Sequence, residues 1–299
     1  MSRSRVVIVK SGRSLGSTDR PDPEAVFRLL RRGFGLLTGE KTGTRAPALI
    51  FRLDDRVGIK INTIGGPTIS TRPEVSLALA RCLSESGLAE KNIIVWDRTN
   101  RELRDAGYRL SMSSNGVRVF GTDTDGVGYG SDLVTHLDIG SLFSTIQTNS
   151  VTASLSLAIL KDHGMAGVTA GMKNYFGAIH NPNKYHDFHC DPFVAQLFDA
   201  PPIKSKHRLS ILDALVVQYH RGPAFHTQWA ERYQGFVFSL DPVAADRVGW
   251  ALIERFRAAK GLPSLKEEGR EPSYLATAEK MGLGRADLGT IDIVEETLP

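Results

Sequence analysis

The sequence is poor in cysteine, which limits the cofactors that the chain can hold. It contains two cysteines, Cys82 and Cys190, among 299 residues. An iron–sulfur cluster held by four local thiolates needs more, so we expect no such cluster in this chain. Cys82 lies inside a helical pattern, where a buried and unreactive thiol is the ordinary arrangement. Nothing in this cysteine content requires an oxidising compartment.

Long apolar runs are also missing. The polar start of the chain leads directly into a short apolar segment, Val6 to Val9, which is too short for the apolar region of a signal peptide. No later segment approaches the roughly 20 apolar residues of a membrane-spanning helix. We therefore expect no membrane partner and a cytoplasmic protein, with export only if a leader has been removed.

Neither sign of charge dominates strongly. The chain has 37 Lys and Arg against 33 Asp and Glu, with an isoelectric point near 9.1. Several arginines gather near the amino end: Arg3, Arg5, Arg13, Arg20, Arg28, Arg31 and Arg32. No recognition motif, aromatic stacking platform or long basic run accompanies them, so a solvated surface is favoured over nucleic-acid binding. The positive excess agrees with a small anionic ligand.

The clearest structural pattern is a strand, a helix and a second strand within about forty residues. An apolar run at 57–61 is followed by a loop with two glycines, then by Thr71, Pro73 and Glu74, which match a helix capping box with proline in the first turn. The helix should end near Gly87, and 92–97 reads as the next strand. This βαβ unit predicts two parallel strands.

Other periodic segments extend this pattern along the chain. We expect further strands near 5–9, 117–120, 154–160, 208–213, 235–239 and 290–294, and helices within 21–33, from 168, after 191, over 242–260 and around 273–281. The composition, 41% hydrophobic and 23% charged, is that of a globular protein. The prediction is an α/β fold with a mostly parallel, Rossmann-like sheet and flanking helices. We expect one domain over 1–299, with the alternative of two lobes, 1–150 and 151–299, around a cleft.

Polar side chains stand where the predicted strands end. Lys60, Asn62 and Asp97 belong to the βαβ unit, and Lys161 ends a later apolar strand. Ligands of open parallel sheets bind beyond the carboxyl ends of the strands, so these residues should face one crevice.

Lys173 and Asn174 fall early in the helix expected from Val168. Together with the strand-end residues they suit a carboxylate or a phosphate, because lysine supplies charge and asparagine supplies oriented donors. The alternative is that the lysines only extend along the rim of the sheet. A lysine in a closed crevice is also a candidate base or Schiff-base nucleophile.

The histidines near Lys161 leave two interpretations open. His163 or His186 can serve as general acid or base, because imidazole titrates near neutral pH. A divalent metal is the other possibility, with zinc, iron, nickel or manganese held by His186, His189, Cys190 and Asp191. His186 and His189 would share one helix face, but their spacing matches no familiar zinc pattern. Surface or hydrogen-bonded histidines are the ordinary alternative.

Successive blocks of the chain resemble the domain-of-unknown-function family 362. They are VGIKINTIGGPTISTRPEV, LKDHGMAGVTAGMKNYFGAI, LSILDALVVQYHRGP and SLDPVAADRVG, with K-D-H-x8-M-K-N-x-F-G as the most specific part. The resemblance implies an α/β protein without a settled activity. It places family positions on Lys60, Asn62, Lys161, His163, Lys173, Asn174, His186 and Asp213. Some relatives look to be fused to ferredoxin-type cysteine motifs or to carry twin-arginine leaders, and this chain departs from both.

The predicted layout is also similar, at fold level, to the nickel-pincer lactate racemase family. The leading hypothesis is an enzyme that acts on a small anionic substrate by isomerase, racemase or lyase chemistry. The competing hypothesis is a non-catalytic accessory or electron-transfer protein that docks an acidic partner. Nucleic-acid binding comes third. Lysines that converge in a pocket would favour the enzyme, and lysines on a flat face would favour docking.

Overall fold

One ten-stranded sheet organises the chain. The computed structural model describes residues 3–299. The sheet has the order β12-β1-β11-β9-β7-β2-β3-β4, with β10 beside β9 and β8 beside β7. Its strands are β1 (Ser4–Ser11), β2 (Val57–Ile61), β3 (Ile93–Asp97), β4 (Arg118–Gly121), β7 (Ala153–His163), β8 (Gly167–Thr169), β9 (His207–Gln218), β10 (Ala230–Glu231), β11 (Gly235–Ser239) and β12 (Ile291–Leu298). The pair β5 (Val134–His136) and β6 (Ile139–Ser141) forms a separate small sheet.

The central sheet is mostly parallel, as predicted. From β9 to β4 every neighbouring pair on the main path is parallel, and β12 is parallel to β1. On that path β11 runs antiparallel to both of its neighbours. The carboxyl ends of β2, β3 and β7 therefore meet at one edge, which is where ligands of parallel sheets bind.

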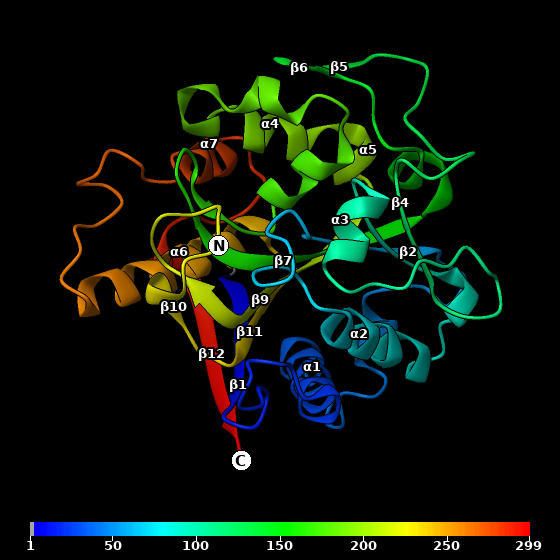
Figure 1. Cartoon of the computed structure of the whole chain (residues 1–299), viewed down its shortest axis with the longest axis horizontal. Helices are drawn as coiled ribbons and strands as arrows, with labels where there is room; N and C mark the ends of the chain where they lie inside the picture. The colour runs from blue at the N-terminus through cyan, green and yellow to red at the C-terminus, as the bar shows by residue number, and fades with distance from the viewer. Residues whose placement is uncertain (1–2) are drawn as a thin grey trace.

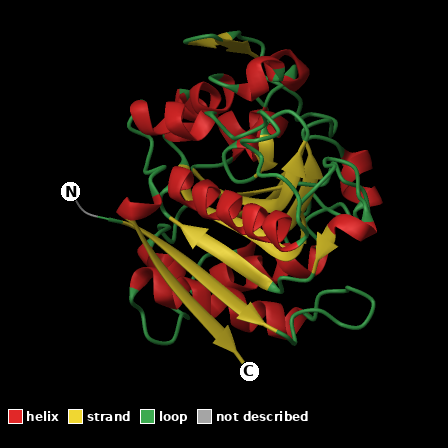
Figure 2. Cartoon of the chain, turned by 90° about the vertical axis from the view of Figure 1, so that its left-hand side faces the viewer, coloured by secondary structure: helices red, strands yellow, loops and turns green. Residues whose placement is uncertain are grey.

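Helices cover both faces of the sheet (Figures 1 and 2). They are α1 (Pro23–Thr38), α2 (Pro73–Glu85), α3 (Asn100–Asp105), α4 (Phe193–Asp199), α5 (Pro201–Lys204), α6 (Pro242–Ala259) and α7 (Tyr274–Lys280). Alternate residues of one strand enter different cores: Val7 belongs to the core that includes α1 and α2, and Val6 to the core that includes α4, α6 and α7. No helix of residues 3–299 combines the length and apolarity needed to cross a membrane.

The predicted βαβ unit is confirmed, with β2 parallel to β3 and α2 between them. The capping box is wrong. The residue at the helix N-cap is Arg72, which makes no side-chain cap. Thr71 lies one residue earlier, and its hydroxyl donates to the Leu157 carbonyl while accepting from the Asn62 amide. The threonine thus ties the loop after β2 to β7 instead of capping α2.

The sheet does not divide at residue 150. Strand β7, which follows that point, pairs directly with β2, which precedes it. Strand β1 pairs with β11 and β12 from the far end of the chain. One sheet therefore joins the two predicted halves.

The helix expected from Val168 is wrong. Gly167 has a φ of +74°, so the chain reverses after β7 and β8 pairs back on it as an antiparallel strand. A 3-10 helix, Lys173–Ala178, follows and carries the lysine and asparagine of the predicted site. The glycines between β7 and Lys173 serve a hairpin and a close approach, and do not begin a helix.

The helix predicted over 242–260 is confirmed as α6, and its N-cap, Asp241, generates a stability test. Asp241 accepts from the Ala244 amide at 2.9 Å, from the Arg285 amide at 2.9 Å and from the Ser4 hydroxyl at 2.5 Å. Replacing Asp241 with Ala should lower the free energy of unfolding by about 2 kcal/mol, since a cap and two further bonds are lost. Urea unfolding measures this loss. Asp241→Asn should keep part of the stability that Asp241→Ala loses. An Ala variant whose free energy of unfolding lies within about 0.5 kcal/mol of the parent would contradict the capping role of Asp241.

Candidate functional site

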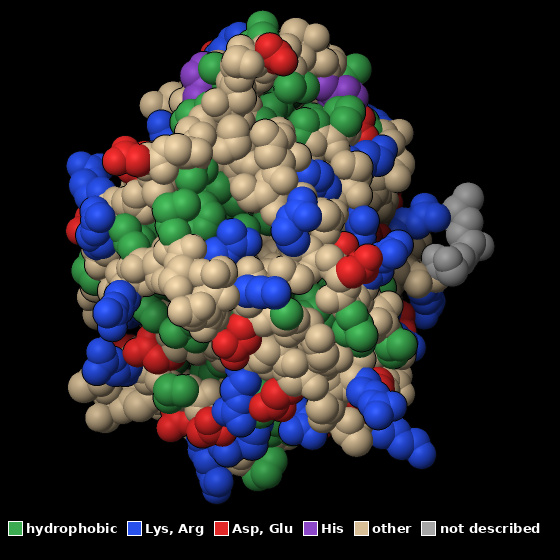
Figure 3. Space-filling model, turned by 90° about the vertical axis from the view of Figure 1, so that its right-hand side faces the viewer, with side chains coloured by type: hydrophobic (Ala, Val, Ile, Leu, Met, Phe, Trp, Pro, Cys, Tyr) green, Lys and Arg blue, Asp and Glu red, His purple; other side chains and the backbone are tan. Residues whose placement is uncertain are grey.

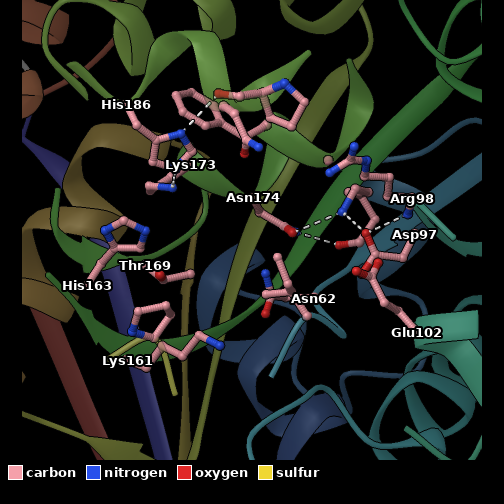
Figure 4. A pocket seen from close by; sticks show the side chains of 17 residues that line it. Asn62, Asp97, Arg98, Glu102, Lys161, His163, Thr169, Lys173, Asn174 and His186 are labelled. Atoms are coloured by element: carbon pink, nitrogen blue, oxygen red, sulfur yellow. Dashed lines mark hydrogen bonds and ion pairs between the residues drawn. The ribbon is translucent and has the colours of Figure 1, made fainter. Parts of the chain in front are cut away.

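A cavity of about 200 Å³ opens at the carboxyl ends of β2, β3 and β7 (Figure 4). Eight of the residues predicted from the sequence line it: Lys60, Asn62, Asp97, Lys161, His163, Lys173, Asn174 and His186. The structure brings these residues together from three strands, the loop after β2, the 3-10 helix Lys173–Ala178 and the link between two further 3-10 turns that carries His186. Asp213, His189, Cys190 and Asp191 do not line this cavity.

Lys60 is held by protein acceptors. Its side chain is 1% exposed and its Nζ donates to Asp97 Oδ1 at 2.6 Å, the Ile61 carbonyl at 2.7 Å and Asn174 Oδ1 at 3.2 Å. These three bonds use all three ammonium protons. The predicted role in substrate binding therefore needs revision, because Lys60 has no donor left for a ligand.

Asp97 and Asn174 complete this internal network. The second Asp97 oxygen accepts from the amide and the hydroxyl of Thr63, both at 2.7 Å. The Asn174 amide donates to the Lys60 carbonyl at 2.8 Å and to the Ser156 hydroxyl at 2.9 Å. Both residues thus fasten the floor of the cavity. They join β2, β3, β7 and the 3-10 helix.

Gly177 shows how closely that helix approaches the network. A Cβ built on Gly177 would lie 2.8 Å from Lys60 Nζ and 3.1 Å from Asp97 Oδ1. Any side chain here would displace the ion pair. Close packing against this ion pair therefore requires a glycine at the end of the K-N-x-F-G motif.

Lys161 differs from Lys60 although both are 1% exposed. Its Nζ is buried and has no hydrogen-bond partner within residues 3–299. Burial, followed by the nearby charge of Lys173, lowers the pKa of Lys161 to about 8. A sizeable fraction of this amine is therefore neutral near pH 8, which suits it to accept a proton or to attack an electrophile.

Lys173 and His186 form a pair on the cavity wall opposite Lys161 (Figure 4). Lys173 Nζ lies 3.2 Å from His186 Nε2 and 4.6 Å from the centroid of the Phe176 ring. His186 Nδ1 lies 3.0 Å from the Pro182 carbonyl and donates to it, so Nε2 accepts from the lysine. Burial lowers the pKa of Lys173 to about 8 and also lowers that of His186.

His163 presents one ring nitrogen as a donor. Its Nδ1 accepts from the amides of Met165 at 3.2 Å and Ala166 at 3.1 Å, so the neutral ring carries its proton on Nε2. Burial, with Lys173 as the next cause, lowers the pKa of His163 to about 2. At neutral pH this ring is a hydrogen-bond donor and not a cation. It stacks on His186 with ring centroids 5.6 Å apart.

The backbone that leads to Lys173 is held by Asp246 of α6. This carboxylate accepts from the amides of Gly171 at 2.7 Å and Met172 at 3.1 Å, and from the Tyr274 hydroxyl at 3.2 Å. Burial raises the pKa of Asp246 to about 7. The sequence predicts only that Asp246 lies in a helix. Its role in positioning the site depends on its contact with Met172, which lies 74 residues earlier in the chain.

Asp213 lines a second, smaller cavity of about 50 Å³. It is 1% exposed, accepts from the Leu215 amide at 3.1 Å and shares this cavity with Ser70 and Arg72. Burial raises the pKa of Asp213 to about 7. The structure thus separates Asp213 from the lysines with which the sequence grouped it.

The predicted metal ligands are not gathered around a common centre. Phe188, His189 and Cys190 all have positive φ angles, so His186 and His189 do not share a helix face as expected. His189 is exposed and its Nδ1 contacts the Met165 carbonyl at 3.0 Å. Within residues 3–299, no three His, Cys, Asp or Glu side chains form a group that could hold a metal ion. The metal remains a prediction without a ligand set.

Sequence reasoning missed several cavity residues. They are Ile64, Arg98, Glu102, Thr169, Phe176, Gly177, Pro182, Asn183 and Pro223. Four of them carried a usable signal, because Arg98 directly follows the strand-end aspartate, Phe176 and Gly177 end the K-N-x-F-G motif, and Pro223 belongs to a Gly-Pro turn pair. The others depend on how loops fold over the sheet edge.

Comparison with known proteins identifies the family. A model of the domain of unknown function DUF362 matches residues 57–251, which is most of the chain. The protein therefore belongs to the DUF362 family, as the sequence blocks suggested. The matched region contains all eight predicted residues that line the cavity. No curated protein and no solved structure matches the chain.

The different surroundings of Lys60 and Lys161 predict that replacing them has opposite effects on stability. Lys161→Met removes a buried charge, and should raise the free energy of unfolding at pH 6–7 by roughly 1 to 3 kcal/mol. The folded pKa is about 8 against an ordinary 10.5. Burial of the charged Lys161 amine therefore destabilises the parent fully below pH 8, and this destabilisation disappears as pH rises to 10.5. Urea unfolding across pH 6–10.5 should show the gain shrinking; a gain that grows with pH would contradict this account.

Lys60→Met should instead destabilise the fold by about 3 to 5 kcal/mol, because it leaves the buried Asp97 carboxylate without its counter-charge. The same unfolding assay at pH 7 measures this loss. The two variants delete the same side chain at equal exposure, so each controls for the other. A loss below about 1 kcal/mol would mean that the ion pair does not hold the cavity floor.

Proposed function

We propose that this protein is an enzyme that binds a small carboxylate- or phosphate-bearing substrate in the Lys161–Lys173 cavity. The supporting observation is the Lys161 amine, which is buried, unpartnered within residues 3–299 and adjacent to a second buried lysine. Burying an amine without an acceptor costs free energy unless a ligand uses it. The anion would lie between Lys161, Lys173 and the Nε2–H of His163.

The chemistry proposed is proton movement on the substrate, of the isomerase, racemase or lyase type. A lysine whose pKa lies near 8 is matched to acid and base work near neutral pH. The Nε2–H of His163 would donate to a developing oxyanion, as a fixed neutral donor. The fold-level similarity to the lactate racemase family that the sequence predicts would favour this class, and it remains a prediction.

The competing function, docking of an acidic protein, is less well supported by where the lysines lie. Lys60, Lys161 and Lys173 are 1%, 1% and 8% exposed, so a flat partner surface cannot reach their ammonium groups. On the face drawn in Figure 3, Lys and Arg side chains are spread among Asp and Glu side chains. A concave site with buried charges suits a small molecule better than a protein surface.

Replacing Lys161 or Lys173 should weaken anion binding while the fold persists. Each of Lys161→Met and Lys173→Met should weaken binding about 10- to 100-fold, which is the value of one charge-assisted hydrogen bond. Isothermal titration calorimetry with inorganic phosphate, lactate and malate measures this change. Lys184→Met is the matched control, since Lys184 is exposed and does not line the cavity.

The pH dependence of binding gives a second reading of the same experiment. Both lysines lose their charge as pH rises through about 8, so affinity for an anion should fall between pH 7 and pH 9. Equal losses in the Lys184 and Lys161 variants, or affinity independent of pH, would count against this site.

A further inference from the structure

Two lysines of the site have the same burial and opposite surroundings. Lys60 and Lys161 are each 1% exposed. The first donates three hydrogen bonds, and the second makes none within the part of the chain that the structure describes. A lysine kept only for its charge is stabilised by an acceptor, as Lys60 is. An amine that faces a cavity without any acceptor has a free lone pair once it is neutral, which is what a nucleophile requires.

We propose that Lys161 forms an imine with the carbonyl carbon of a 2-oxo carboxylate bound in the cavity. This inference rests on the proposed function, because it takes the bound anion to be the carboxylate of the substrate. It adds the substrate class and a covalent step to proton movement at the same site. Lys161 would then be a catalytic residue through its nitrogen.

The choice of a 2-oxo acid follows from the position of Lys173. Such an acid presents its carbonyl oxygen and one carboxylate oxygen side by side, so a single ammonium group can contact both. Lys173 has two ammonium protons left after its contact with His186. The Phe176 ring and Pro182 line the same cavity and offer apolar surface to a short carbon chain.

The step balances with the groups present. The neutral Lys161 amine bonds to the carbonyl carbon, and the π pair moves to the oxygen, which takes a proton from the Lys173 ammonium. The new ammonium of Lys161 returns one proton to Lys173, which leaves a neutral carbinolamine. The hydroxyl then departs as water with a second proton from Lys173, while the nitrogen lone pair forms the C=N bond. The product is a protonated imine, and solvent reprotonates Lys173.

The positive imine has a chemical consequence that fits the proposed reaction class. It withdraws electrons from the neighbouring carbon, so a proton or a carboxyl group leaves that carbon more readily than from the free oxo acid. Lys173 keeps the carboxylate oriented during this change. The same intermediate thus serves isomerase and lyase outcomes.

Reductive trapping tests the imine directly. The full chain is incubated with pyruvate or 2-oxoglutarate and sodium cyanoborohydride, then analysed by intact mass and peptide mapping. We expect one reduced adduct per chain, located on Lys161 and absent when the oxo acid is replaced by lactate. Lys60 should stay unmodified, because it is equally buried but its protons are bound by acceptors. Lys161→Arg keeps a cation and removes the nucleophile, so it should abolish the adduct.

Calorimetry without the reductant separates the two proposals. Binding of pyruvate that needs Lys173, together with no adduct on Lys161, would overturn the imine and leave the anion site standing. An adduct spread over exposed lysines at the level seen in Lys161→Arg would also overturn it. No binding and no adduct would defeat both proposals. Thermal melting of Lys161→Arg confirms that the variant is folded.

Discussion

The buried ion pair between Lys60 and Asp97 is the interaction on which the site depends. Its atoms lie 2.6 Å apart, and each partner is bound further by the segments around it. The pair joins the ends of β2 and β3 to the 3-10 helix that carries Asn174. Because breaking a buried pair costs several kcal/mol, these segments are held in one arrangement. The cavity takes its shape from that arrangement.

Residue type alone does not assign the lysines their roles. Lys60, Lys161 and Lys173 all arrive at the same sheet edge, but their hydrogen bonds differ. Three acceptors bind the Lys60 ammonium, and His186 contacts Lys173. The Lys161 amine is unpartnered within residues 3–299. The chemistry of the site therefore follows from which ammonium protons are still available. His163 adds a neutral donor whose tautomer is fixed by two backbone amides.

The position of the site was predictable, because parallel strands end at one edge and polar residues at strand ends are visible in a sequence. The internal role of Lys60 was not, since it depends on Asn174, which lies 114 residues away in the chain. The β7–β8 hairpin was also missed, because a short apolar run between glycines does not distinguish a strand from the start of a helix. The left-handed backbone at Phe188 to Cys190 has no pattern that distinguishes it from the helix expected there.

Asp213 shows a further limit of sequence reasoning. The sequence places it at the end of a strand, as it does Lys60 and Lys161, but β9 continues to Gln218, so Asp213 lies inside the strand. Residues of the loop between Asn62 and Thr71 line both its small cavity and the cavity of the lysines. Strand-end position fixes the edge of the sheet, and loop packing decides which residues share a cavity. The Thr71 hydroxyl, bound to the Leu157 carbonyl, is part of what holds that loop.

The most direct test of this account is the pKa of Lys161, measured by ¹⁵N NMR titration of lysine side-chain nitrogens. Comparison with Lys161→Arg assigns the signal. The account predicts a midpoint near pH 8, which should rise when phosphate is added because an anion stabilises the charged amine. A midpoint near the ordinary 10.5, unchanged by phosphate, would show an amine that is neither buried nor part of an anion site, and would contradict the account.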